Sequence, residues 1–340
     1  MPKAELHLHL DGSLRPATAL ELARSRRHGL TGLPTDLAGM RDRLVAPARC
    51  LDQADLLRAF ELPVALLQDA EALERSAAEL VEDVAAEGTV YVEIRWAPSL
   101  HLERGLSLAA GIAAVARGSA RAAGAAGIDV RLIAVALRTH TPQMAVAMVR
   151  TAAEFLPEGM TGFDIAGVER DAPDPTVLRE AIDIARDAGL GITCHAGEWD
   201  GPAQVWRALE IAPWRIAHGA VAVDDPALMA ELTRRSVTLD VCPSSNAQAG
   251  IGSRDRDAPL PRLLRAGVPV TISTDDRTVS DLTLVRELTA SVEVLGLTPA
   301  EVAQAMRQAY AAAFLQHDEA LRVRLLARFE AWLADAPVPD

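Results

Sequence analysis

Three histidines and a pair of adjacent aspartates stand in short motifs that are typical of a metal site. His7 and His9 are separated by Leu8 in the alternating run Glu5–Asp11, so on a strand both imidazoles point to one face. A third imidazole, His195, and the pair Asp275–Asp276 each follow a separate apolar run. Three imidazoles with one carboxylate suit a borderline metal such as zinc and leave a coordination position for water. These residues predict a metal centre that activates water.

Further groups near the same motifs are able to move protons. Glu198 follows His195 across the small turn Ala196–Gly197, and His218 ends another short apolar run. A carboxyl group that is kept protonated in a dry pocket acts as an acid, and an imidazole accepts protons near neutral pH. Taken alone, Asp276 is more typical of a helix N-cap than of a catalytic site. The combination favours Glu198, His218 and Asp276 as catalytic residues.

These motifs lie at the ends of short β-rich runs that alternate with helical stretches, and this alternation is typical of a parallel α/β fold. Eight such runs in one chain of 340 residues favour a closed (β/α)₈ barrel, in which catalytic side chains gather at the carboxyl ends of the strands. The expected strands are Glu5–His9, Val90–Trp96, Val130–Leu137, Gly162–Ala166, Gly191–Cys194, Arg215–His218, Thr238–Val241 and Val268–Ser273.

We expect one domain over residues 1–340. The first crossover, from about residue 15 to residue 88, is much longer than the others and contains helical patterns at Leu51–Leu62 and Asp69–Ala86. An insertion at this point is expected to lie over the mouth of the barrel as a lid. The chain beyond Thr298 predicts amphipathic helices that close the outside of the barrel.

Composition restricts the classes of partner. A net charge of −13, few aromatic residues and no run of basic residues argue against binding to nucleic acid and favour a small-molecule ligand. The alanine-rich stretch Leu106–Ala126 contains Arg117 and Arg121, so it predicts a helix that does not span a membrane. Three scattered cysteines and the absence of a signal-peptide pattern suit the cytoplasm. Nothing in the sequence predicts an oligomeric state.

Five motifs closely resemble those of the adenosine deaminase branch of the amidohydrolases, in the same order and spacing. They are His7-Leu8-His9-Leu10-Asp11-Gly12, Cys194-His195-Ala196-Gly197-Glu198, Ile216-Ala217-His218-Gly219, Val241-Cys242-Pro243 and Ser273-Thr274-Asp275-Asp276. The resemblance extends to the segment Leu56–Phe60, which is similar to a hydrophobic gate helix of that family, and to Val92–Arg95.

The resemblance implies a role for each matching residue. His7, His9, His195 and Asp275 would bind one Zn²⁺ ion per chain. Glu198 would protonate the purine ring, while His218 and Asp276 would orient and deprotonate the attacking water. His9 and Asp276 would also contact the substrate. Asp11 would bind a sugar hydroxyl, and the backbone of Gly167 would contact the base. Leu56 and Phe60 would form an apolar wall. The expected reaction removes the 6-amino group of adenosine or deoxyadenosine.

A second metal is not expected, because related amidohydrolases bridge two metals with a carboxylated lysine. The only lysine of this chain is Lys3, ahead of the first strand.

Three departures from the family pattern leave the substrate open. The segment Ser244-Ser245-Asn246 after Cys242-Pro243 differs from the aromatic-containing version of animal enzymes. Val168 stands where many relatives have an acidic or amide residue, and Arg277 replaces a frequent proline. We interpret Arg277 as a solvated charge, or else as a partner for a carboxylate on a modified nucleoside. Adenine, aminodeoxyfutalosine and other substituted aminopurines are alternative substrates, although Asp11, where free-base enzymes usually carry glutamate, favours a nucleoside. Hydrolysis of a different amide, amidine or ester by the same metal site is another alternative, and a catalytically silent barrel that acts as a binding module is the last.

Overall fold

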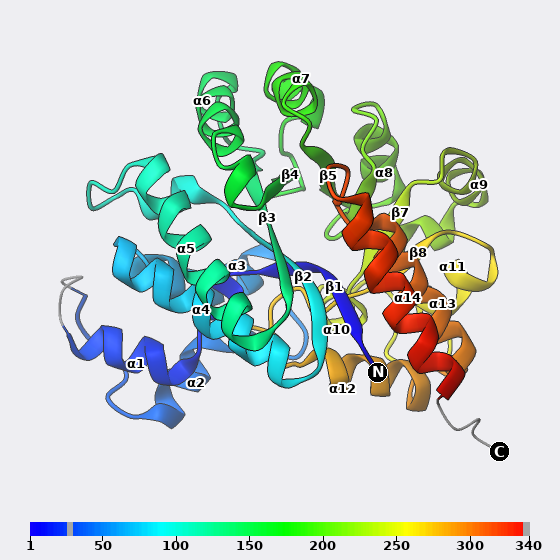
Figure 1. The fold of residues 1–340 in the computed structure, drawn as a ribbon, viewed down its shortest axis with the longest axis horizontal. Helices are drawn as coiled ribbons and strands as arrows, with labels where there is room; N and C mark the ends of the chain where they lie inside the picture. Colours follow the sequence, from blue (N-terminus) through cyan, green and yellow to red (C-terminus); the bar gives the residue numbers. More distant parts are fainter. Residues whose placement is uncertain (26–29, 336–340) are drawn as a thin grey trace.

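Eight parallel strands follow one another in chain order around the centre of the molecule (Figure 1). The computed structural model describes residues 1–25 and 30–335; residues 26–29, within the expected insertion, and 336–340, at the end of the expected domain, lie outside the described residues. The strands are β1 Lys3–His9, β2 Thr89–Trp96, β3 Asp129–Leu137, β4 Met160–Ala166, β5 Gly191–Ala196, β6 Arg215–His218, β7 Thr238–Val241 and β8 Val270–Ile272.

The ring of strands is completed between its two ends. Leu8 on β1 and Asp275 just after β8 form an isolated parallel bridge, and the amide of His9 donates to the carbonyl of Asp275 at 2.8 Å. The predicted (β/α)₈ barrel is confirmed, with every expected strand present and its limits shifted by a few residues at most.

The interior of the barrel contains paired charges below the strand ends. Arg215 donates to Asp240 at 2.9 Å and to Glu93 at 2.5 Å, and Arg95 donates to Asp164 at 2.8 Å. All five side chains are fully buried. Buried charges are tolerated when each one has a hydrogen-bonded partner of opposite sign. This network forms a rigid layer beneath the carboxyl ends of the strands.

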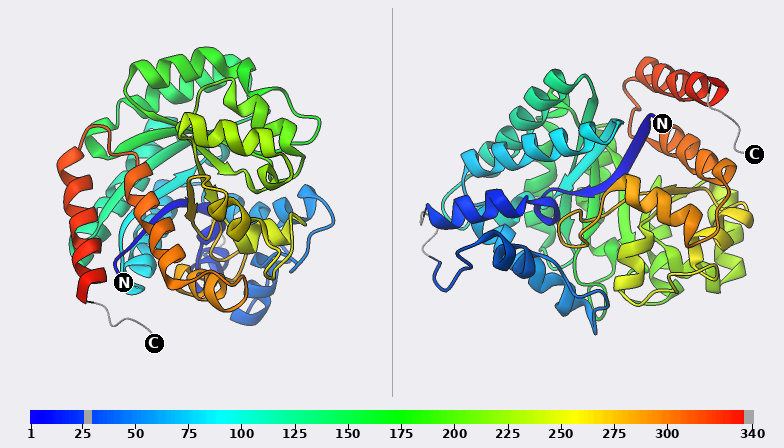
Figure 2. Two further views of the ribbon diagram at one scale, coloured as in Figure 1. Left: turned by 90° about the vertical axis from the view of Figure 1, so that its right-hand side faces the viewer. Right: turned by 90° about the horizontal axis from the view of Figure 1, so that it is seen from below.

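Helices surround the strands on the outside of the barrel (Figure 2). They are α4 Ala70–Ala86, α5 Leu108–Ala126, α6 Pro142–Ala153, α7 Arg179–Asp187, α8 Pro202–Leu209, α9 Pro226–Arg235, α11 Pro259–Arg265, α12 Leu284–Glu293, α13 Pro299–Ala312 and α14 Glu319–Asp335. A further short helix, α10 Pro243–Gln248, directly follows β7 and contacts the segment after β8 through Ser245. In agreement with the sequence, α13 packs against β1 and β8 and carries α14 on its outer side. In both figures α14 lies close to the start of the chain.

Among the residues that the structure describes, three further helices precede α4 in the long first crossover. They are α1 Pro16–Arg24, α2 Leu37–Leu44 and α3 Gln53–Leu66, and Figure 1 shows α1 and α2 at the edge of the molecule away from α14. By contrast, α4 packs along α5 in the outer ring of the barrel. The capping carboxylates Asp52 and Asp69 accept hydrogen bonds from the first turns of α3 and α4, which fixes where each helix begins.

The alanine-rich helix α5 is a surface helix of the barrel. Its Arg117 donates to Glu74 of α4 at 3.1 Å. Within the part of the chain that the structure describes, no helix is long and apolar enough to cross a membrane.

Candidate active site

Four side chains converge at the carboxyl end of the barrel. Nε2 of His7 lies 3.3 Å from Nε2 of His9 and 3.0 Å from Oδ1 of Asp275. Nε2 of His9 lies 3.3 Å from the same carboxylate oxygen and 3.2 Å from Nε2 of His195. Ligand atoms about 2.1 Å from a tetrahedral zinc ion stand roughly 3.4 Å apart. The spacing of these four atoms therefore fits a single metal ion.

The local backbone explains how both aspartates reach this centre. β8 ends at Ile272, and Asp275 adopts a left-handed conformation with φ of +68°. His218, at the end of β6, has φ of +66°. Residues with a side chain rarely adopt this conformation, and such outliers gather at functional sites. Because the regular strand has ended, Asp275 and Asp276 are not forced to opposite faces of the sheet.

The surroundings of His195 suit a metal ligand. Its Nδ1 lies 3.0 Å from Oδ2 of Asp164 on β4, which leaves Nε2 free to face the centre. A carboxylate that orients the far nitrogen of a ligating histidine is a common feature of metal sites. Burial lowers the pKa of His195 and holds the pKa of His7 well below its usual range, so both rings stay in the neutral form that binds metals.

His218 stands beside the four converging atoms. Its Nε2 lies 3.8 Å from Oδ2 of Asp275 and 3.7 Å from Oε2 of Glu198, farther than the contacts of His7 and His9. It also belongs to a buried group with His7, His195 and Asp275, whose potential ligand atoms all lie within 4.8 Å of one another. Burial lowers the pKa of His218 to about 3, so the ring is in its neutral form at neutral pH.

Glu198 is held next to this centre by a turn that requires glycine. Gly197 has φ of +70°, and a Cβ atom there would collide with the side chains of Val221 and Val205. Burial raises the pKa of the Glu198 carboxyl well above its usual value, and the charge of Asp275 adds to the rise. Glu198 therefore keeps its proton to a higher pH than an exposed glutamate does.

Carboxyl groups are unusually dense around the converging atoms. Burial raises the pKa of Asp276 well above its usual value, and the nearby carboxylates of Asp275, Asp11 and Glu198 raise it further. Repulsion within a buried cluster of acids is relieved by protonation, as at Glu198 and Asp276, or by a nearby positive charge. The donor set, its spacing and its charge all fit a divalent metal ion.

Every residue that the sequence assigned to substrate binding lines one pocket above this centre. Leu56, Leu57 and Phe60 of α3 form an apolar wall, so we call α3 the lid helix. The predicted substrate residues in the lining are His9, Asp11, Leu56, Phe60, Gly167 and Asp276. The lining also includes the predicted His195, Glu198, His218 and Asp275, together with Gln53, Ala97, Leu100, Val135, Leu137 and Ala166. The structure thus brings the predicted metal, catalytic and substrate residues together.

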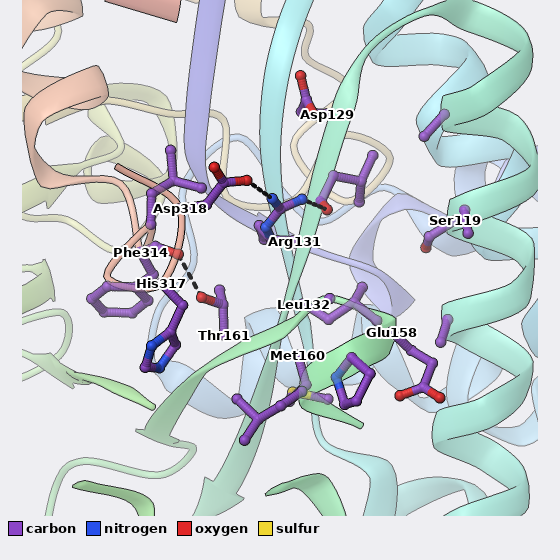
Figure 3. Close-up of a pocket in the computed structure, with 18 of the residues that line it drawn as sticks. Ser119, Asp129, Arg131, Leu132, Glu158, Met160, Thr161, Phe314, His317 and Asp318 are labelled. Atoms are coloured by element: carbon purple, nitrogen blue, oxygen red, sulfur yellow. Dashed lines mark hydrogen bonds and ion pairs between the residues drawn. The ribbon is translucent and has the colours of Figure 1, made fainter. Parts of the chain in front are cut away.

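A larger cavity lies elsewhere in the protein. It encloses about 660 Å³, against about 120 Å³ for the pocket under the lid helix, and it is lined by the amino-terminal ends of β3 and β4 together with α5. Figure 3 shows Arg131 facing Asp318, and Thr161 bonded to the carbonyl of Phe314. In (β/α)₈ barrels this end serves stability, whereas active sites lie at the carboxyl end. We therefore identify the smaller pocket as the candidate active site.

Comparison with known proteins agrees with this geometry. The model of a family described as adenosine deaminase matches residues 2–329. An adenosine deaminase of Mycobacteroides abscessus is 40% identical over 343 residues, which cover 95% of this chain and 92% of that protein. The adenosine deaminase of Enterococcus faecalis is 35% identical over 319 residues, covering 94% of each chain. This chain belongs to the adenosine deaminase family.

Solved structures of similar fold include deaminases that are named for different substrates. An adenine deaminase from Arthrobacter aurescens is 26% identical, with a TM-score of 0.87 over 98% of this chain and 99% of its own. An Arabidopsis deaminase of N6-mAMP is 29% identical, with a TM-score of 0.86 over 97% and 98%. A zinc-bound amidohydrolase from Burkholderia ambifaria is 27% identical, with a TM-score of 0.84 over 98% and 92%. The chain is therefore a hydrolytic deaminase, and its substrate is a separate question.

Three residues of this adenosine deaminase family member contact the centre without having been predicted. Asp164 orients His195, as described above. Ser245 donates to Oδ2 of Asp275 at 2.7 Å, and the amide of Asn246 lies 3.1 Å from Nδ1 of His218. Asp164 carried a usable signal, since it is a charged residue inside the apolar run of the fourth strand. Ser245 and Asn246 carried none beyond their place after Cys242–Pro243.

The structure corrects both interpretations of Arg277. Its side chain is only 9% exposed, pairs with Glu87 just after α4, and does not line the pocket. The side chain of Arg277 is therefore neither a solvated charge nor placed to contact a substrate. Its partner lies 190 residues earlier in the chain, which is why the sequence alone did not reveal it. Val168, another departure, is 40% exposed and also lies outside the lining.

Proposed function

We propose that this protein is a zinc-dependent deaminase that removes the 6-amino group of an aminopurine nucleoside and releases ammonia. Adenosine and deoxyadenosine would yield inosine and deoxyinosine. The observation that carries the proposal is the buried carboxyl of Glu198, with its raised pKa, beside neutral His218 and beneath an apolar pocket. A binding module has no need of such an acid.

We assign the metal to four residues. His7, His9, His195 and Asp275 would hold one zinc ion per chain, supported by their spacing of 3.0 to 3.3 Å. When bound, zinc lowers the pKa of water from about 16 toward about 7, so that a nucleophile is available at neutral pH.

His218 and Asp276 act on the attacking water. His218 is neutral and fully buried, and its Nε2 points toward Glu198 and Asp275, so it takes the proton that the water loses. Asp276 lines the same pocket and orients the water toward the ring carbon that bears the amino group. The proton taken by His218 then passes to the departing amine, which leaves as ammonia.

Glu198 acts on the purine ring rather than on the water. Attack on the ring carbon breaks the aromaticity of the purine and places electron density on the adjacent ring nitrogen. Glu198 delivers a proton to that nitrogen as the new bond forms, and it regains one from the new hydroxyl group on the ring carbon when ammonia leaves and the carbonyl forms. Because its raised pKa keeps the carboxyl protonated, the acid is ready at neutral pH.

The remaining lining favours a nucleoside. Asp11 is only 4% exposed and places a carboxylate in the pocket, where it would accept a hydrogen bond from a sugar hydroxyl. The carboxylate of Asp11 would also repel a phosphate group, which argues against nucleotides such as N6-mAMP. Leu56 and Phe60 would cover the apolar faces of the ligand, and the backbone at Gly167 would contact the base.

A substrate screen tests this proposal. Purified protein loaded with zinc would be offered adenosine, deoxyadenosine, adenine, aminodeoxyfutalosine and AMP, with ammonia release as the readout. We expect turnover of adenosine or deoxyadenosine and little turnover of AMP. Preference for adenine or aminodeoxyfutalosine would change the substrate assignment, and no turnover of any of the compounds would contradict the proposed function. Metal analysis giving two ions per chain would contradict the single-zinc assignment.

A further inference from the structure

One buried carboxylate holds the turn that carries Glu198. Glu169, three residues after β4 ends, accepts four backbone N–H groups in succession. They belong to Gly197 at 2.5 Å, Glu198 at 3.0 Å, Trp199 at 2.7 Å and Asp200 at 3.1 Å. Hydrogen bonds to an ionised acceptor are among the stronger ones in proteins. The position of Glu198 therefore depends directly on the position of Glu169.

The same segment is bonded to the lid helix. Gln53 is the first residue of α3, and its amide nitrogen donates to the carbonyl of Gly167 at 3.2 Å. The amide oxygen of Gln53 accepts the backbone N–H of Glu169 at 2.9 Å. One side chain thus makes two hydrogen bonds to the short stretch that carries Glu169.

The turn contacts the lid helix by a second route. Trp199, directly after Glu198, is 9% exposed and packs in a small apolar cluster with Leu56 and Ala59 of α3. Ala46, Cys50 and Val279 complete this cluster, which is separate from the main core. Polar and apolar contacts therefore join the same two elements independently.

We propose that Glu169 is the positioning residue for Glu198, and that Gln53 links it to the lid helix, so that α3 covers the pocket and fixes the acid together. In this arrangement a substrate enclosed by Leu56 and Phe60 meets an acid that is already in place. The inference rests on the proposed function only in naming Glu198 as the acid. The hydrogen bonds that carry it are independent of substrate.

Hydrogen exchange of the zinc-loaded protein tests the link without any substrate. In Gln53→Ala, the amides of residues 197–200 should exchange at least about tenfold faster than in the parent, because their common acceptor is less well held. The matched control is Gln68→Ala. Gln68, two residues beyond α3, makes the same kind of amide contacts, to the carbonyl of Leu100 at 2.8 Å and the N–H of Glu103 at 3.1 Å, but none to Glu169. Unchanged exchange at 197–200 in Gln53→Ala, or an equal increase in both variants, would overturn the proposal.

Kinetics separate positioning from simple binding. Gln53→Ala should lower kcat about tenfold at saturating nucleoside, because a displaced acid slows the chemical step. Gln68→Ala should keep kcat near that of the parent. A rise in KM alone for Gln53→Ala would show that Gln53 serves only binding and would overturn the proposal. If the parent turned over no aminopurine, the proposed function would fail, while the exchange comparison would still decide whether the link exists.

A double variant tests whether Gln53 acts through Glu169. Glu169→Gln keeps the shape of the side chain but replaces an acceptor oxygen with an N–H donor. In that background, adding Gln53→Ala should change the exchange at 197–200 by less than about twofold, since the link is already broken. Fully additive effects would overturn the inference. If Glu169→Gln does not fold, Glu169→Asp takes its place in the cycle.

Discussion

Nδ1 of His195 lies 3.0 Å from Oδ2 of Asp164, and both side chains are buried where β4 and β5 run side by side. The same carboxylate oxygen accepts a hydrogen bond from Arg95 at 2.8 Å, so Asp164 is itself held in place. The arrangement sets both the ring plane and the proton position of His195, and it leaves Nε2 facing His9. The charged layer inside the barrel thus continues directly into the candidate metal centre.

Replacing Asp164 with asparagine should weaken zinc binding. Loss of the carboxylate that orients a ligating histidine typically costs about 10- to 100-fold in metal affinity. We expect this loss for Asp164→Asn in a chelator competition assay, with activity recovering as zinc is added in excess. The control is Asp240→Asn, because Asp240 is equally buried but bonds Arg215 and Thr271 instead of a histidine. Equal losses of affinity in the two variants would show that the effect is only structural.

The sequence predicted those parts of the site that depend on local pattern. The alternation of Leu6, His7, Leu8 and His9 places two imidazoles on one face of β1, and the three leucines, counting Leu10, lie fully buried in the main core. Strand ends in a parallel barrel all meet at one rim. Motifs far apart in the chain, such as those at His195 and Asp275, were therefore predictable neighbours.

The contacts that the sequence did not predict depend on how separate segments align. Asp164 meets His195, and Glu87 meets Arg277, only once strand register and helix placement are known. Gln53 gave no signal at all, because a polar residue at the start of a helix is ordinarily exposed to solvent. Pairings of this kind are tertiary, and neither spacing nor residue type within one segment determines them.

The proposed acid should set the alkaline limit of activity. Because the pKa of Glu198 is raised in the folded protein, kcat/KM should stay level below that pKa and fall as the pH rises through it. The stability of the zinc-free protein should also decrease as the pH rises through the pKa of Glu198. A carboxyl group whose pKa is raised in the folded protein stabilises it relative to the unfolded chain. This contribution to the free energy of unfolding is fully present below the ordinary carboxyl pKa of about 4.3, and it is lost as the pH rises through the pKa of the folded state.

Glu198→Gln provides the comparison for both effects. The variant should keep its zinc, while kcat falls by about 10² to 10⁴, the usual contribution of a positioned acid. Without the ionisable group, the thermal midpoint of its zinc-free form should decline less with rising pH than that of the parent. An active Glu198→Gln enzyme, or identical pH dependence of the two midpoints, would show that Glu198 is not the acid.

Gly12 should be essential for the position of Asp276. A Cβ atom at Gly12 would overlap the carboxylate of Asp276. Gly12→Ala should therefore displace Asp276 and lower kcat by about 10², as small misplacements of reacting groups do. Gly124→Ala is the matched control, since Gly124 lies in α5 with open space around its Cβ position. That variant should keep full activity and gain about 0.5–1 kcal/mol in the free energy of unfolding; an equally inactive Gly124→Ala would remove the steric explanation.

Asp11 should determine whether the enzyme recognises the sugar. It lies in the pocket lining and is buried, and its carboxylate accepts only a weak backbone contact, from Gly12 at 3.3 Å, so it has capacity for a hydroxyl donor. Removing a hydrogen bond to a charged group costs about 1.5–3 kcal/mol, or about 10- to 150-fold in kcat/KM. We therefore expect Asp11→Ala to lose that much activity toward adenosine while any activity toward adenine stays the same. Equal losses on the two substrates, measured by ammonia release under identical conditions, would mean that Asp11 supports the metal centre rather than the sugar.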